Sequence, residues 1–335
     1  MLAMSLNEPD LIENNPLRLV EIETPKPGLY EILVRIQACG ICHTDLHTVE
    51  GELDLPKKPI VPGHQVVGMV EELGKGASRF KKGNRVGMAW LYSTCGKCSY
   101  CRKDKENLCE NAQFTGYHVN GGYAQYAVIH QDFAYPIPDK FSEEQAAPLL
   151  CAGIIGYRAL RLSKIKPGQR LGLYGFGASA HVAIQIAVHW GCKVYVFSRS
   201  KEHQKLGEDL GAVWTGKSSK MPPEKLDSAI IFAPVGEIVL DALKALDKGG
   251  ALALAGIYMS PIPQMDYTEH LYYERTLRSV TASTRKDGEE LFQIAAEIPI
   301  QTKTASFPLE EANKALRLLK QGKINGAGVL KIPRP

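Results

Sequence analysis

The chain has 335 residues, of which 44% are hydrophobic and 23% are charged, and its formal net charge is +4. At roughly 150 residues per domain, this length predicts about two domains, each large enough to bury a core. The composition excludes a disordered chain, a collagen and a coiled coil. The net charge is small and spread along the chain, which argues against binding to nucleic acid or to an anionic membrane.

The N-terminal region has the pattern of a β-rich domain with many turns. Leu17–Ile22 and Glu31–Ala38 alternate apolar and polar residues, as half-buried strands do, and Pro25–Gly28 between them is typical of a turn. The first residues carry acids where a signal peptide needs basic and apolar ones. The most apolar stretch, Leu171–Trp190, is interrupted by three glycines and a histidine, so the sequence does not predict a membrane-spanning helix there. We therefore expect a cytoplasmic protein.

Strands alternate with helices in the second part of the chain, which predicts βαβ units and a parallel sheet. The predicted strands are Arg170–Tyr174, Lys193–Phe197, Ser228–Phe232 and Ala251–Ala255, and the predicted helices are Ala178–Trp190, Lys201–Leu210 and Ile238–Leu246. The tail has an amphipathic stretch, Glu310–Gln321, and a last strand, Gly326–Ile332. We expect domains over residues 1–152 and 153–283, with residues 284–335 folding back to complete the first.

Four cysteines cluster in one short loop of the first domain: Cys95, Cys98, Cys101 and Cys109. Two-residue gaps allow successive thiolates to point at one centre, and four thiolates make a closed tetrahedral zinc site with a structural role. A chance cluster of surface thiols would be an oxidation hazard. An iron–sulfur cluster is the other cluster with four sulfur ligands, but nothing else in the chain indicates electron transfer. The loop therefore predicts a structural zinc.

A second group of ligand residues is dispersed. Cys42 and His64 could supply two of the three protein ligands that a catalytic zinc needs, with a fourth position left open. Spacing does not fix the third ligand, and Cys151 in an apolar run is the best candidate. Each residue considered alone also has a structural interpretation: Cys151 as a small buried apolar residue, and His64 as a core histidine with its hydrogen bonds made within the protein.

A glycine turn follows the first strand of the second domain and precedes a helix. Its residues are Gly175, Phe176, Gly177, Ala178, Ser179 and Ala180. In that context the pattern favours a dinucleotide site, where the first glycine permits the turn, the second lets the backbone approach the pyrophosphate, and the helix N-terminus receives the phosphates. A plain strand–turn–helix is the alternative.

The end of the next strand bears on the choice between NAD and NADP. An enzyme that uses NAD usually has Asp or Glu there, about 20 residues past the glycines, to bind the ribose 2′-hydroxyl. This chain has Ser198 followed by Arg199. A serine does not repel a 2′-phosphate and an arginine can pair with one, so we expect NADP to be preferred over NAD. The alternative is that Arg199 simply begins a solvated helix.

Together these motifs resemble those of the zinc-dependent medium-chain alcohol dehydrogenases, over nearly the whole chain. The resemblance is carried by GICHTDLH (Gly40–His47), PGHxxxG (Pro62–Gly68), the four-cysteine loop, the LLCAG around Cys151 and the glycine turn. It implies an α/β protein with a Rossmann domain, built on a doubly wound parallel sheet, beside a β-rich GroES-like catalytic domain. It also implies two zinc ions per chain, a small alcohol or aldehyde as substrate, and a homo-oligomer, either a dimer or a tetramer.

The resemblance also implies roles for individual residues. Cys42, His64 and Cys151 would bind the catalytic zinc, Asp45 would orient His64, Thr44 would take the proton of the alcohol, and His47 would end the relay to solvent. Trp90 falls where such enzymes line the substrate pocket, although a plain core aromatic is the competing interpretation.

Two positions depart from the family pattern. Gln65 stands where the family usually has glutamate, and Ala327 where relatives often have an arginine that reaches the cofactor phosphates, which leaves His43 as the nearer cation. Two alternative functions therefore remain: a zinc-free quinone reductase of the same superfamily, and a non-catalytic homologue with a structural or cofactor-sensing role. The complete set of three zinc ligands argues against the first, and only Gln65 and Ala327 support the second.

Overall fold

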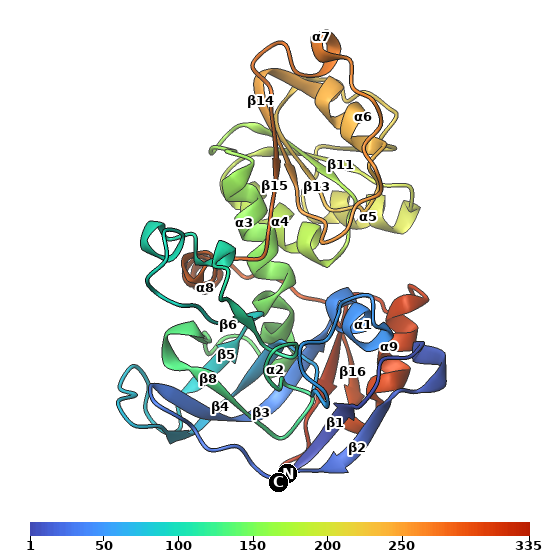
Figure 1. The fold of residues 1–335 in the computed structure, drawn as a ribbon. Coiled ribbons are helices and arrows are strands. Elements are labelled where there is room, and N and C mark those ends of the chain that lie inside the picture. Colours follow the sequence, from blue (N-terminus) through green and yellow to red (C-terminus); the bar gives the residue numbers. More distant parts are fainter. The chain divides into compact units, whose positions relative to one another are not determined.

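The computed structural model describes residues 1–335, which form two compact units (Figure 1). The first comprises Met1–Cys151, Ala282–Ala296 and Gln301–Pro335, and the second comprises Ala152–Thr281 and Glu297–Ile300. The first unit is β-rich and the second is built on a parallel sheet, which confirms the predicted fold class.

A seven-stranded sheet forms the centre of the first unit. Its strands are β3 (Glu31–Ile41), β4 (Gln65–Leu73), β5 (Arg85–Met88), β8 (Tyr126–His130), β9 (Ala134–Pro136), β16 (Thr304–Pro308) and β17 (Ala327–Lys331). They run in the order β16-β17-β3-β4-β5-β9, with β8 paired to β3. Two smaller pairs join β1 (Leu2–Leu6) to β2 (Leu17–Glu21) and β6 (Leu91–Ser93) to β7 (Gln113–Phe114).

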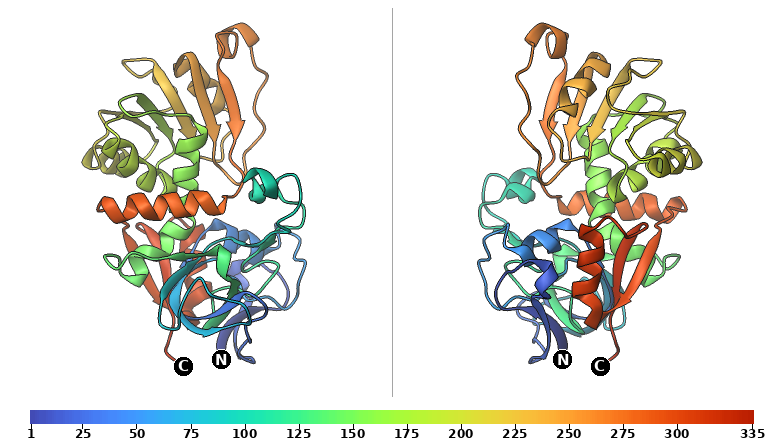
Figure 2. Two further views of the ribbon diagram at one scale, coloured as in Figure 1. Left: turned by 90° about the vertical axis from the view of Figure 1, so that its left-hand side faces the viewer. Right: turned by 90° about the vertical axis from the view of Figure 1, so that its right-hand side faces the viewer.

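Strand β3 organises this sheet because it is long enough to hold two partners on one edge. Its first half pairs with β8 through Glu31–Arg35, and its second half pairs with β17 through Ala38–Ile41. The end of the chain therefore completes a sheet that its beginning starts. Both termini lie side by side at one end of the unit (Figures 1 and 2).

Four α-helices belong mainly to this unit: α1 (His43–Glu50), α2 (Glu143–Ala146), α8 (Arg285–Glu297) and α9 (Ala312–Lys320). Helix α9 packs against α1, so the C-terminal segment supports the helix that follows β3. A continuous apolar core joins residues from both ends of the chain, including Leu6, Ile36, Val66, Leu316 and Leu330.

The second unit contains six parallel strands in the order β12-β11-β10-β13-β14-β15. They are β10 (Arg170–Tyr174), β11 (Lys193–Phe197), β12 (Trp214–Gly216), β13 (Leu226–Ile231), β14 (Leu246–Leu254) and β15 (Thr276–Ser279). The helices are α3 (Ala152–Leu162), α4 (Ala178–His189), α5 (Lys201–Asp209), α6 (Ile238–Ala245) and α7 (Tyr267–His270). The order reverses between β10 and β13, and ligands bind at such a switch point in doubly wound sheets.

Several local assignments differ from the sequence analysis. Leu246 was expected to end a helix, but it begins β14, where it pairs with Leu226 of β13. Strands β1, β12 and β15 were not predicted, because they are short and depend on distant partners rather than on local periodicity. Helix α8, which is 13 residues long, was also not predicted. None of the helices combines the length and the apolar character that a membrane span requires.

Candidate metal centres and cofactor site

Cys42 stands at the junction between β3 and α1. It precedes the helix in an extended conformation, and its backbone N–H donates to Asp45 Oδ2 at 2.9 Å. This hydrogen bond closes the first turn of the helix and fixes the Cys42 backbone. The same turn buries Asp45, whose side chain is 2% exposed.

His64 immediately precedes β4 and is held from behind by Asp45. Its Nδ1 lies 3.1 Å from Asp45 Oδ1, which also accepts the backbone N–H of Gly63 at 3.2 Å. His64 Nε2 lies 3.3 Å from Cys42 Sγ. Burial tends to lower the pKa of His64, but the charges of Asp45 and Cys42 outweigh it and raise that pKa well above its usual value.

Cys151 completes the group from the end of the short helical segment Ala147–Leu150. The ligand atoms of Cys42, His64 and Cys151 all lie within 4.8 Å of one another. A hydrogen bond with Cys151 lowers the pKa of the Cys42 thiol well below its usual value, and the same bond and burial raise that of Cys151. A metal ion at this position would bind both sulfurs as thiolates.

The chemistry of these donors fits a zinc ion. Two sulfurs and one imidazole nitrogen form a ligand set found in catalytic zinc sites, with one position left for a further ligand. The separation of Cys42 Sγ and His64 Nε2 is close to the ~3.5 Å expected between neighbouring tetrahedral ligands. Asp45 holds the far nitrogen of His64, so Nε2 is the atom that remains to bind the metal.

The residues predicted to move a proton lie on the first turns of α1. Thr44 is buried, and a hydrogen bond from its side chain contributes to the lowered pKa of Cys42. His47 is one turn further on, and its Nδ1 lies 2.7 Å from the carboxylate of the exposed Glu52. His43 is exposed at the start of the helix, and its ring lies 6.4 Å from that of His47.

Trp90 lies directly beside the three-ligand group. Its ring meets the His64 ring edge-on with centroids 4.9 Å apart, and it stacks on Phe114 with centroids 5.0 Å apart. Tyr117 adds a third ring, 5.9 Å from that of Trp90. The tryptophan is therefore half-buried in an aromatic cluster beside the metal ligands, and is not a remote core residue.

The four cysteines of the loop also converge, with all ligand atoms within 4.8 Å of one another. Cys98 and Cys101 have sulfurs 3.5 Å apart, as do Cys95 and Cys109. Sulfurs on a tetrahedral zinc with bonds of about 2.3 Å lie ~3.8 Å apart, so the spacing fits. Backbone N–H groups of Lys97 and Cys98 lower the pKa of the Cys95 thiol to about 6, which favours a metal-binding thiolate.

In the second unit, the glycine turn joins the end of β10 to the start of α4. Gly175 has φ +82°, and a Cβ there would lie 2.9 Å from Ala233 after β13, so a side chain would strain the turn. Nothing lies within 4 Å of a Cβ built on Gly177, and Gly177 and Ala178 are exposed. The first turn of α4 thus presents free space and backbone N–H groups to a phosphate. Phe176 and Ala180 are buried and Ser179 is half-buried.

Ser198 and Arg199 follow β11, at the same edge of the sheet as the glycine turn. The Gly175 N–H donates to the Phe197 carbonyl at 2.9 Å, which brings the two segments together. Ser198 is half-buried and its carbonyl accepts the Gln204 amide at 2.7 Å. Arg199 is exposed.

The two residues that depart from the family pattern, Gln65 and Ala327, lie in different surroundings. Gln65 is 3% exposed at the start of β4, and its side-chain Nε2 is buried without a hydrogen-bond partner. Its amide packs against Gly40, where a Cβ would lie 2.7 Å from Oε1. Ala327 begins β17, and its N–H donates to the Lys303 carbonyl at 2.8 Å.

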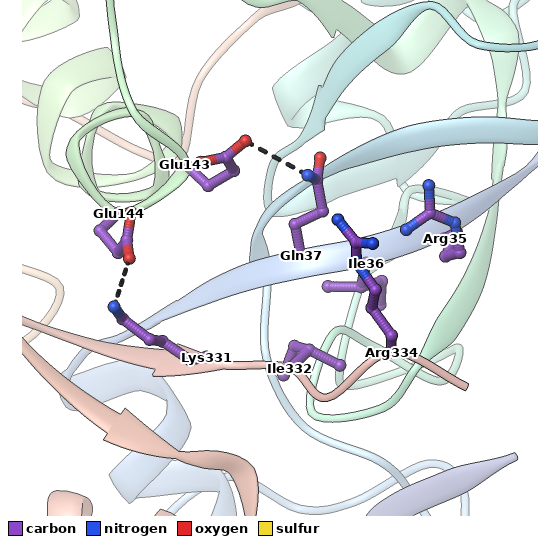
Figure 3. A pocket seen from close by; sticks show the side chains of 8 residues that line it. All are labelled: Arg35, Ile36, Gln37, Glu143, Glu144, Lys331, Ile332 and Arg334. Carbon is purple, nitrogen blue, oxygen red and sulfur yellow. Dashed lines mark hydrogen bonds and ion pairs between the residues drawn. The ribbon is translucent and has the colours of Figure 1, made fainter.

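A groove of about 350 Å³ lies elsewhere on the first unit (Figure 3). None of its lining residues is a predicted site residue. Several of its charged groups have partners within the protein: Lys331 contacts Glu144 at 2.8 Å, Arg35 contacts Glu71 at 3.3 Å, and Glu143 accepts the neutral Gln37 amide at 3.2 Å. Its charges are therefore largely satisfied within the protein, and we assign no ligand to it.

Comparison with known proteins places these features in a family. The family described as "Alcohol dehydrogenase GroES-like domain" matches residues 28–139, and "Zinc-binding dehydrogenase" matches residues 180–297. The chain belongs to the zinc-dependent medium-chain alcohol dehydrogenases, and it is therefore a zinc-dependent alcohol oxidoreductase.

Individual relatives match almost end to end. The chain is 46% identical to a probable alcohol dehydrogenase, AdhA, of Mycobacterium tuberculosis, over 99% of this chain and 97% of that one. A crystal structure of CAD from Helicobacter pylori complexed with NADP(H) is similar with a TM-score of 0.86 and 26% identity, covering 99% of both chains. Acetophenone reductase from Geotrichum candidum, solved with NAD, has a TM-score of 0.86 and 25% identity, covering 98% of this chain and 96% of that one.

Proposed function

We propose that this protein interconverts a primary alcohol and its aldehyde at a zinc site made by Cys42, His64 and Cys151, with NADP(H) preferred over NAD(H). The observation that carries the proposal is the convergence of these three ligands, with Asp45 bound to the far nitrogen of His64. A zinc ion held by these residues would supply Lewis-acid chemistry, which would favour loss of the proton of the substrate hydroxyl.

The residues of α1 then account for the proton. The Thr44 hydroxyl lies next to Cys42 and is buried, so it can accept the proton of the substrate hydroxyl away from bulk water. His47 is half-exposed and contacts the exposed Glu52, which offers a route to solvent. In aldehyde reduction the same groups return the proton.

A nicotinamide cofactor supplies the hydride acceptor or donor, and the glycine turn is where we propose that its pyrophosphate binds. Gly175 allows the turn, Gly177 leaves room, and α4 directs its N-terminus at the phosphates. We propose that Arg199 pairs with the 2′-phosphate of NADP, that Ser198 tolerates it, and that His43 contacts the cofactor phosphates. The preference for NADP over NAD is supported by Ser198, because this position carries no carboxylate that would repel a 2′-phosphate.

We further propose a structural zinc in the four-cysteine loop and a domain division over residues 1–152, 153–283 and 284–335. Trp90 is proposed to line the substrate site, because it contacts His64 and is held by two further rings.

We also propose a cytoplasmic homo-oligomer. Tyr267 and Tyr272 of the second unit are exposed, with ring centroids 5.9 Å apart, and such exposed aromatic side chains are suited to burial against another copy.

Two measurements test the proposal. Elemental analysis of protein purified without chelators should find two zinc ions per chain, and one or none in folded protein would refute the two-site assignment. Steady-state kinetics with ethanol, a longer primary alcohol and a benzylic alcohol, each with both cofactors, should show alcohol oxidation. Activity towards quinones alone would favour the zinc-free reductase, and no activity would favour the non-catalytic homologue.

A further inference from the structure

Tyr123 is buried directly behind the three-ligand group, and neither the motifs nor the proposed mechanism gives it a role. Its side chain is 0% exposed, and its hydroxyl group has no hydrogen-bond partner. Burying an unpaired hydroxyl costs about 1–3 kcal/mol, and a phenylalanine would fill the same space without that cost. An unpaired buried hydroxyl therefore needs an explanation.

The backbone fixes Tyr123 against the segment that carries His64. Three successive hydrogen bonds join Gly121 N to Val61 O at 2.7 Å, Gly122 N to Gly63 O at 2.9 Å, and Tyr123 N to Pro62 O at 3.0 Å. Any movement of Tyr123 would therefore be transmitted to the residues immediately before His64.

The ring of Tyr123 fills the space that Gly63 leaves. Gly63 has φ +98°, and a Cβ there would lie 2.4 Å from Tyr123 Cδ1. Glycine is required at this position both for its backbone conformation and for the ring beside it. The ring is thus locked in place, and its hydroxyl cannot turn away to solvent.

Asp45 is the charged group that the hydroxyl approaches. Burial raises the pKa of Tyr123 well above its usual value, and the negative charge of Asp45 raises it further. Asp45 already accepts N–H groups from Cys42, Gly63 and His64. A carboxylate has about four acceptor positions, so one remains for a further donor.

We propose that Tyr123 is a positioning residue of the metal site: its hydroxyl, unpaired in this structure, donates to the Asp45 carboxylate in the zinc-loaded protein and so holds His64 with Nε2 directed at the metal. The inference rests on the proposed zinc site of Cys42, His64 and Cys151. Groups that orient a metal-bound histidine typically contribute about 10–100-fold to metal affinity or activity when they are removed. Tyr123 would thus act through Asp45, without touching metal or substrate.

The test is the rate at which the zinc-loaded protein releases metal to excess dipicolinate, followed together with its melting temperature. Tyr123→Phe should release one of its two zinc ions about 10–100-fold faster than the wild type. Tyr174→Phe is the matched control: Tyr174 is also almost fully buried with an unpaired hydroxyl, but it lies in the unit that carries no candidate ligand. Its release rates should equal those of the wild type.

A double-mutant cycle separates positioning from packing. In the Asp45→Asn background, Tyr123→Phe should change the release rate by less than about two-fold, because the acceptor charge is gone. The cobalt-exchanged Tyr123→Phe protein should also show altered visible ligand-field absorption, which a purely structural role would not produce.

The inference is overturned if Tyr123→Phe releases metal at the wild-type rate, whether its melting temperature is raised, unchanged or lowered. Equal effects of Tyr123→Phe in both backgrounds would also overturn it. These outcomes differ from failure of the proposed function, in which the wild type itself would hold no zinc at Cys42, His64 and Cys151.

Discussion

Arg285 holds the buried carboxylate of Glu106 with two N–H groups: its backbone N–H lies 2.9 Å from Oε1 and its Nε 3.3 Å from the same oxygen. Glu106 lies between Cys101 and Cys109, and Arg285 is the first residue of α8. The guanidinium also lies over the Phe133 ring, 5.0 Å from its centroid. The four-cysteine loop is thus tied to the helix where the chain re-enters the first unit.

Replacing Glu106 with glutamine should therefore destabilise the first unit. The neutral amide loses the charge-assisted bonds to Arg285, which should cost about 1–3 kcal/mol in the free energy of unfolding, measured by denaturant titration of the zinc-loaded protein. Glu110→Gln is the matched control, because Glu110 is exposed beside the same loop. Equal effects of the two variants would contradict the role of the pair.

Two cysteine variants should separate the proposed roles of the metal sites. Cys151→Ser should abolish alcohol oxidation and remove one zinc. It should leave the melting temperature almost unchanged, because an open metal site contributes little to the stability of the fold. Cys98→Ser should instead lower the melting temperature, because a closed site contributes folding energy. Loss of stability alone in both variants would show that Cys151 does not belong to the open site.

Cofactor preference should follow the residues after β11. Ser198→Asp combined with Arg199→Ser should move the ratio of kcat/KM for NADP(H) over NAD(H) towards NAD(H). The loss of one charge-assisted hydrogen bond, worth about 1.5–3 kcal/mol, corresponds to roughly 10- to 150-fold in that ratio. A wild-type ratio that already favours NAD(H) would refute the proposed preference and leave the zinc assignment intact.

A carboxylate of the second unit should make stability depend on pH. Arg170 donates to Asp227 from Nε at 2.9 Å and from Nη2 at 2.8 Å, and these hydrogen bonds lower the pKa of Asp227. A lowered pKa in the folded state gives stability that is present above the unfolded value, about 3.9, and is lost as pH falls through the folded value.

Asp227→Asn should accordingly reduce the melting temperature at pH 7 and have progressively less effect below pH ~4. We expect a loss of about 1–3 kcal/mol at pH 7. Asp247→Asn is the comparison, because Asp247 is 45% exposed and meets Arg170 through a single contact at 3.3 Å. Its loss should be smaller, and a pH-independent effect of Asp227→Asn would contradict the assignment.

The fold class could be predicted because its signals are local. Alternation in Leu17–Ile22 and the strand–turn–helix around Gly175 depend only on neighbouring residues. The antiparallel pairing of β17 with β3 joins opposite ends of the chain, and no local pattern encodes it. Sequence periodicity therefore predicted the strongly patterned elements, missed others such as β4 and α8, and left the sheet order open.

The residues of the candidate site also differ in how far they could be predicted from the sequence. Cys42 and Asp45 lie within one helical turn, so their association follows from spacing, whereas Cys151 joins them only through the tertiary fold. Spacing left this third ligand open, and the resemblance to the family supplied it. Tyr123 and Glu106 were missed altogether, since a single buried tyrosine or glutamate carries no spacing signal that separates it from ordinary core or surface residues.

The pairing of β17 with β3 also has a consequence for synthesis on the ribosome. The second unit is formed almost entirely by one continuous stretch, Ala152–Thr281, so it can fold as soon as that stretch emerges. The first unit must wait for its last strand, and until then β3 carries an unpaired edge along Ala38–Ile41 beside Cys42. We therefore expect the nascent chain to complete the unit that carries the glycine turn before the unit that carries the candidate metal ligands.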